Sequence, residues 1–247
     1  MSKFQWSIII FILVEGGIYF QFQGSDFYYP LLLAGFILYL SLIFAFSMNL
    51  PLRFFVNASV NSEKGSVALG FDDGPHPENT LKILNILDKY NAKAAFFLIG
   101  KQAEDNQEIV KEMFRRGHKI GGHSYSHPIN FGFLSYKNVA VEIMDGIKIV
   151  EEITQSEIVL FRPPFGVTNP RIAKVINKNN LEVIAWNLRS YDTATKDPDS
   201  LLKKLKKKVK SGSSILLHDS VPATLEILPE LLEYIRDKNL QIRPSFE

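Results

Sequence analysis

The stretch Ser66–Pro75 reads Ser-Val-Ala-Leu-Gly-Phe-Asp-Asp-Gly-Pro. Its first six residues form a short apolar run that ends at a Gly-Pro turn, and such a run is typical of a buried parallel strand. The adjacent carboxylates of Asp72 and Asp73 are therefore expected where the strand leaves the sheet. That edge of the sheet is where α/β folds build their functional sites.

Two neighbouring acids repel each other, and burying both in ionised form is costly unless a cation or a proton lies between them. A metal ion is the natural partner. The alternative is that Asp72 or Asp73 only caps the loop before the helix expected from about Thr80, and an isolated Asp-Asp pair would favour that interpretation. Motifs elsewhere in the chain have to decide between the two.

The composition describes a chain with one substantial core. It has 247 residues, 46% of them hydrophobic, and no cysteine, so the core forms without disulfides. Lys and Arg number 28 against 26 Asp and Glu, which gives no reason to expect a nucleic-acid partner. The distribution of charge is uneven, because the first sixty residues hold only Lys3, Glu15, Asp26 and Arg53. We therefore expect a membrane anchor over residues 1–56, a polar linker over 57–65 and one larger domain over 66–247.

The anchor is expected to contain one or two transmembrane helices. Residues 31–48 are nearly all apolar and long enough to cross a hydrocarbon core of about 30 Å at about 1.5 Å per residue. The earlier apolar run, Phe4–Phe22, predicts a weaker second span, because Glu15 near its middle costs on the order of 2.5 to 3.5 kcal/mol in a bilayer. A signal peptide is the alternative for this run, but no small-residue cleavage site follows it. The protein is thus expected to be integral to a membrane, with the lipid bilayer as a partner.

Two topologies remain open. If both runs span, Lys3, Arg53 and Lys64 lie at the same end of a hairpin, and the positive-inside rule places that end in the cytoplasm. If only the second run spans, the large domain lies on the opposite side of the membrane from Lys3.

The remainder of the chain alternates between strand-like and helix-like segments. Strands are expected at 66–71, 93–99, 118–120, 158–161, 182–186, 214–217 and 240–243, and helices at 80–90, 107–116, 136–154, 169–178, 199–209 and 224–237. Seven such units in roughly 180 residues predict an α/β fold, an incomplete (β/α) barrel rather than an open sheet covered on two sides.

Two histidines four residues apart, His123 and His127, follow a pair of glycines. This spacing allows a short stretch to supply two metal ligands. With one acid they make a three-ligand set that leaves coordination positions free for water, as in catalytic zinc sites. Water bound in this way has a pKa near 7 and becomes a usable nucleophile, and the second carboxylate of the Asp pair can take its proton.

Two further strand ends carry candidate residues. In Phe161–Gly166, which reads Phe-Arg-Pro-Pro-Phe-Gly, the first backbone donor after Arg162 is the N–H of Phe165, on a rigid turn where an oxyanion could bind. Arg162 would pair with a carboxylate and keep it ionised, although a stiff loop with a surface arginine is an equal alternative. His218 follows the apolar run 215–217 and can protonate a leaving group near neutral pH.

Taken in order, four motifs resemble the polysaccharide deacetylase family, carbohydrate esterases with a NodB homology domain, over about residues 66–243. They are Phe71-Asp72-Asp73-Gly74-Pro75, His123 with His127, Arg162-Pro163-Pro164-Phe165-Gly166, and Leu217-His218-Asp219. The resemblance implies a distorted (β/α) barrel and a divalent metal, most often Zn²⁺, that helps water to remove an acetyl group from an N-acetylated glycan.

The resemblance also implies a role for each matching residue. These roles are the base for Asp72, the metal ligands for Asp73, His123 and His127, the tether of the base for Arg162, the oxyanion donor for the Phe165 N–H, and the acid for His218.

The chain departs from the family pattern at three positions. Gly70 stands where threonine is common, and Phe165 where tyrosine is common, a change of little effect because the backbone N–H is the donor. Arg189 stands where many members have an acid that orients the catalytic histidine. We expect Asp192 to substitute for that acid.

The leading interpretation is a metal-dependent hydrolase that acts on an acetylated polysaccharide or oligosaccharide, N-acetylated rather than O-acetylated, without an obligate protein partner. The alternative is a catalytically weakened carbohydrate-binding or regulatory domain that keeps the metal site, and Arg189 is the feature that favours it. A metal-dependent amidase or esterase for a small molecule is a third possibility. Glycans of this family usually lie outside the cytoplasm, which favours an extracytoplasmic domain, against the hairpin topology.

Overall fold

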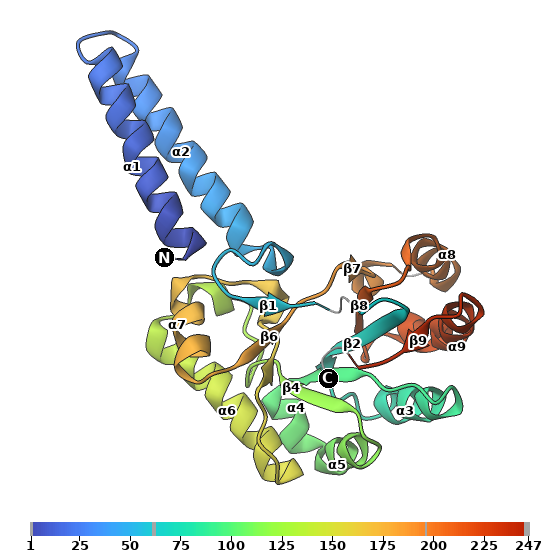
Figure 1. Cartoon of the computed structure of the whole chain (residues 1–247). Coiled ribbons are helices and arrows are strands. Elements are labelled where there is room, and N and C mark those ends of the chain that lie inside the picture. Colours follow the sequence, from blue (N-terminus) through green and yellow to red (C-terminus); the bar gives the residue numbers. More distant parts are fainter. Residues whose placement is uncertain (1, 61–62, 196, 245–247) are drawn as a thin grey trace.

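The structure is a computed structural model that describes residues 2–60, 63–195 and 197–244. It consists of a helical hairpin that projects from an α/β domain (Figure 1). The hairpin is formed by α1 (Lys3–Phe22) and α2 (Tyr28–Ser47), which pack against each other along their length. Both helices are long and apolar enough to cross a membrane.

The domain is built on a curled parallel sheet. Along the sheet the strands are β1 (Ala58–Ser59), β6 (Glu182–Ile184), β5 (Leu160–Phe161), β4 (Lys119–Gly122), β3 (Ala95–Leu98), β2 (Ser66–Gly74), β8 (Ser213–His218) and β7 (Leu188–Arg189), while β9 (Gln241–Ile242) pairs with the start of β2. Among the described residues the end strands β1 and β7 are not paired with each other. The sheet is therefore a partly closed barrel, which confirms the predicted fold class.

Helices cover the outside of this sheet (Figure 1). They are α3 (Asn79–Lys89), α4 (Gly100–Asp105), α5 (Gln107–Arg115), α6 (Tyr136–Thr154), α7 (Pro170–Lys178), α8 (Pro198–Lys208) and α9 (Pro222–Asp237), with 3₁₀ turns η1 (Leu50–Leu52), η2 (Phe131–Phe133), η3 (Pro164–Gly166) and η4 (Asp192–Ala194). Local sequence fixes several starts. Ser135 caps α6 and Asn169 caps α7 by accepting hydrogen bonds from backbone N–H groups one turn on.

The seven predicted strands and six predicted helices of the domain are all present within a few residues. The sequence missed β1 and β7, because two-residue strands are too short to show a period, and it missed α4, a helix of six residues. β1 is formed by residues expected in the linker, and it pairs with β6. The rest of the expected linker includes residues 61 and 62, which lie outside the described residues.

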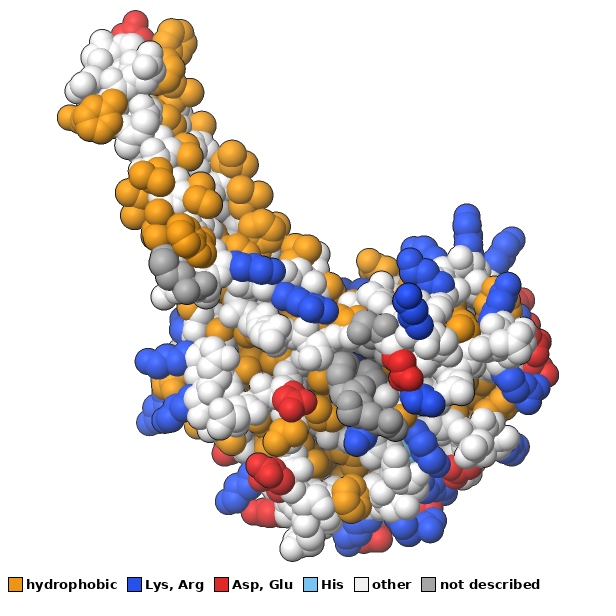
Figure 2. All heavy atoms as spheres, viewed as in Figure 1, with side chains coloured by type: hydrophobic (Ala, Val, Ile, Leu, Met, Phe, Trp, Pro, Cys, Tyr) orange, Lys and Arg blue, Asp and Glu red, His pale blue; other side chains and the backbone are white. Residues whose placement is uncertain are grey.

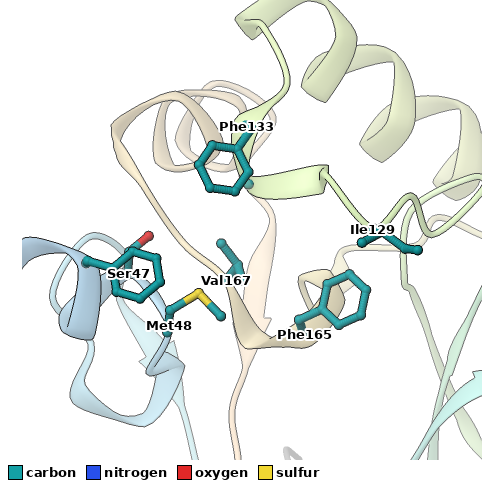
Figure 3. Close-up of a pocket in the computed structure, with 8 residues that line it drawn as sticks. Ser47, Met48, Ile129, Phe133, Phe165 and Val167 are labelled. Carbon is teal, nitrogen blue, oxygen red and sulfur yellow. The ribbon is translucent and has the colours of Figure 1, made fainter.

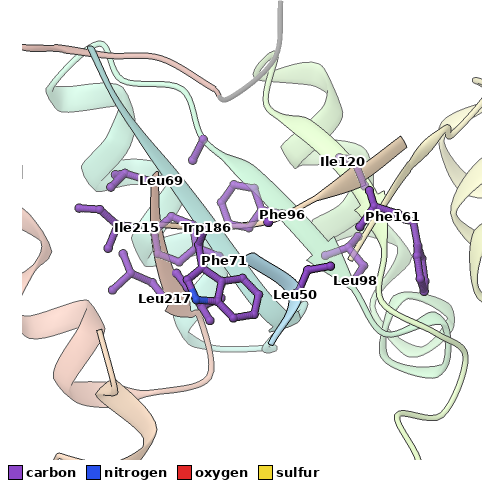
Figure 4. Close-up of a cluster of buried hydrophobic side chains, with 14 of the residues drawn as sticks. Leu50, Leu69, Phe71, Phe96, Leu98, Ile120, Phe161, Trp186, Ile215 and Leu217 are labelled. Carbon is purple, nitrogen blue, oxygen red and sulfur yellow. The ribbon is translucent and has the colours of Figure 1, made fainter. Parts of the chain in front are cut away.

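The core lies between the sheet and its helices. Figure 4 shows Leu69 and Phe71 of β2 beside Phe96 of β3 and Ile215 of β8. The Phe71 and Phe96 rings stack with their centroids 5.0 Å apart. β2 is buried along almost its whole length because both of its faces are covered, which explains why its sequence shows an apolar run rather than alternation.

The hairpin is attached to the domain by contacts at the end of α2. The Thr168 N–H donates a hydrogen bond to the Ser47 carbonyl at 2.8 Å, and the Ser47 hydroxyl donates back to the Thr168 carbonyl. Leu50 of η1 is buried in the domain core, where it and Trp186 both lie against Gly166. The base of the hairpin is thus part of the folded domain.

Gly146 of α6 allows this helix to pack closely against the loop that follows β4. A Cβ at Gly146 would lie 2.6 Å from the Ser124 carbonyl carbon and 2.9 Å from the Tyr125 nitrogen, and both atoms are backbone. We expect Gly146→Ala to lower the free energy of unfolding by about 1–3 kcal/mol, measured by urea denaturation, because helix or loop must move. The exposed neighbour Asp145 provides the control, since Asp145→Ala should change stability by less than about 0.5 kcal/mol. Equal stability of the two variants would contradict the packing.

Candidate active site

Candidate residues from four strand ends meet at the carboxyl edge of the sheet. They surround a cavity of about 150 Å³ that is lined by Asp72, Asp73, His123, His127, Phe165, Gly166, Trp186, Arg189, Thr193, Leu216 and His218. Parallel strands all end at the same edge, so residues that are distant in sequence converge there. Of the residues that the sequence singles out, Arg162 and Asp192 lie behind this cavity and contact its lining.

The two adjacent carboxylates reach the same cavity because β2 is irregular at its end. Successive side chains in a regular strand point to opposite faces. Here the register with β3 shifts between Asp72 and Gly74, and Asp73 has a positive φ of 67°. A bulge of this kind redirects a side chain, so Asp73 turns toward the cavity together with Asp72, which lies opposite His218 of β8.

Asp73, His123 and His127 form a compact group of possible metal ligands. The Asp73 Oδ1 atom is 3.3 Å from His123 Nε2 and 3.4 Å from His127 Nε2, and it is buried without a hydrogen-bond partner among the described residues. Donors about 2.0–2.2 Å from a tetrahedral ion would lie roughly 3.3–3.6 Å apart. The three donors therefore fit a divalent metal ion.

Neighbouring groups orient His123 and keep Asp73 ionised, as metal ligands require. The His123 Nδ1–H donates to the Arg162 carbonyl at 2.6 Å, which leaves the Nε2 lone pair directed toward Asp73. Burial raises the pKa of Asp73, but the imidazoles around it lower this pKa by a larger amount, to about 2. The carboxylate is thus ionised at neutral pH.

Three residues of the site have left-handed backbone conformations that non-glycine residues rarely adopt. They are Asp73, His127 with φ of 52° and Phe165 with φ of 58°. Such conformations are kept only where the surrounding structure enforces them, and they concentrate at functional sites. No glycine marks these positions, so the sequence does not reveal them.

Arg162 is completely buried, which excludes the surface-arginine alternative. Its Nη1 donates to Asp72 Oδ1 at 2.6 Å, its Nε donates to the Ile184 carbonyl at 3.0 Å, and its guanidinium carbon lies 3.8 Å from the centre of the Phe97 ring. A Cβ at Gly70 would lie 2.8 Å from Nη1. Glycine at position 70 therefore leaves the space that the guanidinium fills.

The imidazole of His218 is held by Asp192. His218 Nδ1 lies 2.8 Å from Asp192 Oδ1, and the His218 backbone N–H and the Thr224 hydroxyl both donate to Asp192 Oδ2. Burial lowers the pKa of His218, but the carboxylates of Asp192, Asp72 and Asp73 together raise it more, and the net shift is upward. The free Nε2 of His218 faces the cavity, 3.8 Å from Asp73 Oδ2.

Arg189 lines the cavity without contacting the His218 ring in any interaction found among the described residues. Its guanidinium lies 5.2 Å from the Tyr191 ring centre and 6.0 Å from that of Trp186. The contact expected of an acid at position 189 is made instead by Asp192, three residues later.

Two residues near the cavity were not singled out from the sequence as functional. Trp186, at the end of a predicted strand, forms part of the cavity wall. Asp219 accepts a hydrogen bond from the Thr80 hydroxyl at 2.6 Å, and burial raises the pKa of its carboxyl group to about 6. The same sequence feature could have identified both residues, because each lies at the carboxyl end of an apolar run.

A family model described as polysaccharide deacetylase matches residues 59–184. The chain is 35% identical over 180 residues to a peptidoglycan-N-acetylglucosamine deacetylase of Bacillus cereus, an alignment that spans 69% of this chain and 83% of the relative. It is 32% identical over 166 residues to a chitooligosaccharide deacetylase of Azorhizobium caulinodans, spanning 67% and 79% of the two chains. The chain therefore belongs to the polysaccharide deacetylase family and is a hydrolase of that type.

Solved structures of the family share the fold. One is a CE4 family pseudoenzyme, BA3943, from Bacillus anthracis, which superposes with a TM-score of 0.70 at 25% identity over 76% of this chain and 66% of its own. This likeness confirms the curled barrel. Because that neighbour is a pseudoenzyme, the fold alone does not establish activity.

The Asp192 contact predicts a specific kinetic defect. We expect Asp192→Asn to lower kcat for acetate release by about a hundredfold or more, because His218 loses the carboxylate that orients it and raises its pKa. The alkaline limb of the pH profile should also move to lower pH, since a less basic His218 gives up its proton earlier as pH rises. Asp145→Asn on exposed α6 is the control. Unchanged turnover and an unchanged profile would show that Asp192 does not position His218.

Proposed function

We propose that this chain is a metal-dependent deacetylase of an N-acetylated glycan, with residues 66–247 as its catalytic domain. The observation that supports this most is the convergence of three metal-ligand donors with a buried carboxylate, Asp72, and a histidine, His218, around one cavity. The related proteins act, by their names, on N-acetylglucosamine of peptidoglycan and on chitooligosaccharides. An acetamido sugar is therefore the substrate group that we assign, with an amide rather than an ester as the bond cleaved.

Asp73, His123 and His127 would hold the metal, and we propose Zn²⁺ because two imidazoles and one carboxylate are a donor set that zinc prefers. A divalent ion bound there supplies Lewis acidity and lowers the pKa of water toward about 7.

Asp72 is the general base in this proposal. Its carboxylate is buried and accepts a charge-assisted hydrogen bond from Arg162, which holds it in place beside the cavity. It accepts a proton from the attacking water. Arg162 acts through Asp72 and is a positioning residue.

The Phe165 N–H is the oxyanion donor. Among the described residues no acceptor meets this N–H, although the following two N–H groups are bonded to the carbonyls of Pro163 and Pro164. The two prolines and the left-handed conformation at Phe165 hold the donor in a fixed direction. It stabilises the negative charge that develops on the acetyl oxygen when water adds to the carbonyl carbon.

His218 completes the reaction as the general acid. Its Nε2 delivers a proton to the sugar nitrogen as the C–N bond breaks, and Asp192 stabilises the charged imidazole through Nδ1. The products are acetate and a free amine, and the proton taken up by Asp72 balances the proton given by His218.

Residues 1–56 are proposed to be a membrane anchor with two spans. Each helix has 20 mostly apolar residues, and hydrophobic side chains cover much of the hairpin surface while Lys and Arg gather on the domain (Figure 2). The Glu15 Oε1 atom is buried against Gly35 of α2 within the hairpin, which shields this oxygen from lipid. The buried base of the hairpin supports an anchor that is retained rather than cleaved as a signal peptide.

Metal dependence is tested by removal and by mutation. We expect a chelator to abolish acetate release from N-acetylated chitooligosaccharides and Zn²⁺ to restore it. His127→Ala should weaken Zn²⁺ binding, measured by calorimetry, by about 10²-fold or more, because one of three protein ligands is lost. His118→Asn removes a buried histidine outside the site, which accepts a hydrogen bond from the Ala94 N–H and packs against the Phe96 ring, and it should leave Zn²⁺ affinity unchanged. Retained Zn²⁺ binding in His127→Ala, or full activity with chelator, would contradict the proposal, and tight metal binding without turnover would favour the weakened-domain alternative.

Anchor retention is tested on the full chain. We expect intact-mass measurement of the mature protein to show that residues 4–56 are present, and the protein to stay in the membrane pellet after alkaline carbonate washing, because two spans of 20 residues are buried in lipid. A mature chain that begins after residue 22 would show that the first helix is a signal peptide.

A further inference from the structure

An apolar groove lies between the end of α2 and the catalytic cavity. Its volume is about 300 Å³, within the range of small-molecule sites. Figure 3 shows Ser47 and Met48 on one side of it, with Phe133, Ile129, Val167 and Phe165 around the rest. Nothing in the proposed deacetylation uses this groove.

The groove exposes apolar surface to an unusual degree. Ile129 is 94% exposed and Phe133 is 78% exposed, the two highest values for large apolar side chains in the described part of the domain (63–195 and 197–244). Contiguous exposed apolar patches of this kind mark interaction sites rather than free surface. The loop that carries them is held in place, because the Asn169 side chain donates to the Gly132 carbonyl at 2.8 Å.

One wall of the groove belongs to the proposed membrane span. Phe44, Ser47 and Met48 are the last residues of α2 and its cap. The Ser47 hydrogen bonds to Thr168 fix this end of the helix to the segment that carries Phe165 and Val167. If α2 spans a bilayer as proposed, the apolar surface at its end is continuous with the groove, which favours a lipid chain as its occupant.

The opposite wall is shared with the active site. Phe165 lines both the groove and the catalytic cavity, and its ring centre lies 4.5 Å from that of His127. A chain in the groove would thus be separated from a metal-ligand histidine by a single aromatic ring. A head group joined to that chain would lie at the mouth of the catalytic cavity.

We propose that the groove receives the hydrocarbon chain of a lipid that carries the acetylated sugar, so that the substrate is a lipid-linked N-acetylated glycan taken from the membrane surface. This inference rests on the proposed deacetylase function and on the proposed anchor. A lipid-linked substrate does not have to be a free polymer. It would lie at the membrane surface on whichever side the domain faces.

The test compares two substrates with the same head group and the full chain reconstituted in lipid nanodiscs. The substrates are the hexadecyl and the methyl glycosides of N,N′-diacetylchitobiose, and acetate release is measured for both. We expect kcat/KM to be higher for the hexadecyl glycoside by at least about tenfold, since burial of two methylene groups alone accounts for that factor. Release from the methyl glycoside reports the deacetylase function independently of the groove.

A groove variant separates binding in the groove from simple enrichment of the hexadecyl glycoside in the bilayer. Phe133→Ser should lower the ratio of kcat/KM for the hexadecyl glycoside to kcat/KM for the methyl glycoside, close to the value expected from enrichment in the bilayer alone. The control is Val141→Ser, at an exposed position on α6 outside the groove, which should keep the wild-type ratio. A ratio that Phe133→Ser does not change would overturn the inference and leave the deacetylase function standing.

A binding measurement keeps the inference testable if neither glycoside is hydrolysed. The chain has no cysteine, so Ile129→Cys can carry a single bimane fluorophore in the groove, with Val141→Cys as the control. Hexadecyl chitobioside brominated on its chain should quench the fluorophore at 129 and not at 141. Equal quenching of the fluorophore at 129 by a brominated phospholipid without a sugar would show that the groove holds bilayer lipid only. Quenching of this fluorophore only after soluble protein is added would indicate a protein partner. Either result overturns the inference.

Discussion

The active-site edge of this protein depends on one buried residue, Arg162. Its guanidinium donates to the Asp72 carboxylate, and its backbone carbonyl accepts the Nδ1–H of His123. It also bonds to the Ile184 carbonyl, so it joins the ends of β2, β4 and β6. An unpaired charge in this position would be very costly. The Asp72 carboxylate pairs with the charge, and Nη1 and Nε of the guanidinium each meet an acceptor, while the buried Nη2 has none among the described residues. The ends of β2, β4 and β6 are therefore held together, with Asp72 and His123 on either side of Arg162.

This arrangement explains how two adjacent acids come to have different environments. Asp72 continues the strand and faces Arg162, whereas the bulge at Asp73 directs the next carboxylate toward the imidazoles. A regular strand would have placed one of them on the other face of the sheet. On the far side of the cavity, Asp192 rather than residue 189 contacts His218, so the imidazole has a carboxylate partner although position 189 is an arginine. The proposed chemistry follows from these contacts together.

The helical hairpin is attached to the segment that carries Phe165. Because Leu50 is packed into the domain core and Ser47 is bonded to Thr168, the end of α2 and the Phe165 segment form one unit. If the hairpin is the proposed membrane anchor, this attachment would fix the orientation of the cavity relative to the bilayer as well as its location. The apolar groove at this junction is a consequence of that attachment. It lies beside the proposed active site, with Phe165 lining both.

The sequence by itself determined the fold class, the strand and helix order, the two apolar helices and almost all of the candidate residues, because hydrophobic period and ordered motifs are local features of the chain. Only the tertiary structure decided which groups touch. The burial of Arg162, the partner of His218 and the redirected Asp73 side chain depend on strand register, a bulge and left-handed backbone conformations, none of which a residue type specifies. The groove beside Phe165 likewise exists only because residues more than a hundred positions apart are packed together, and no local pattern records such a contact.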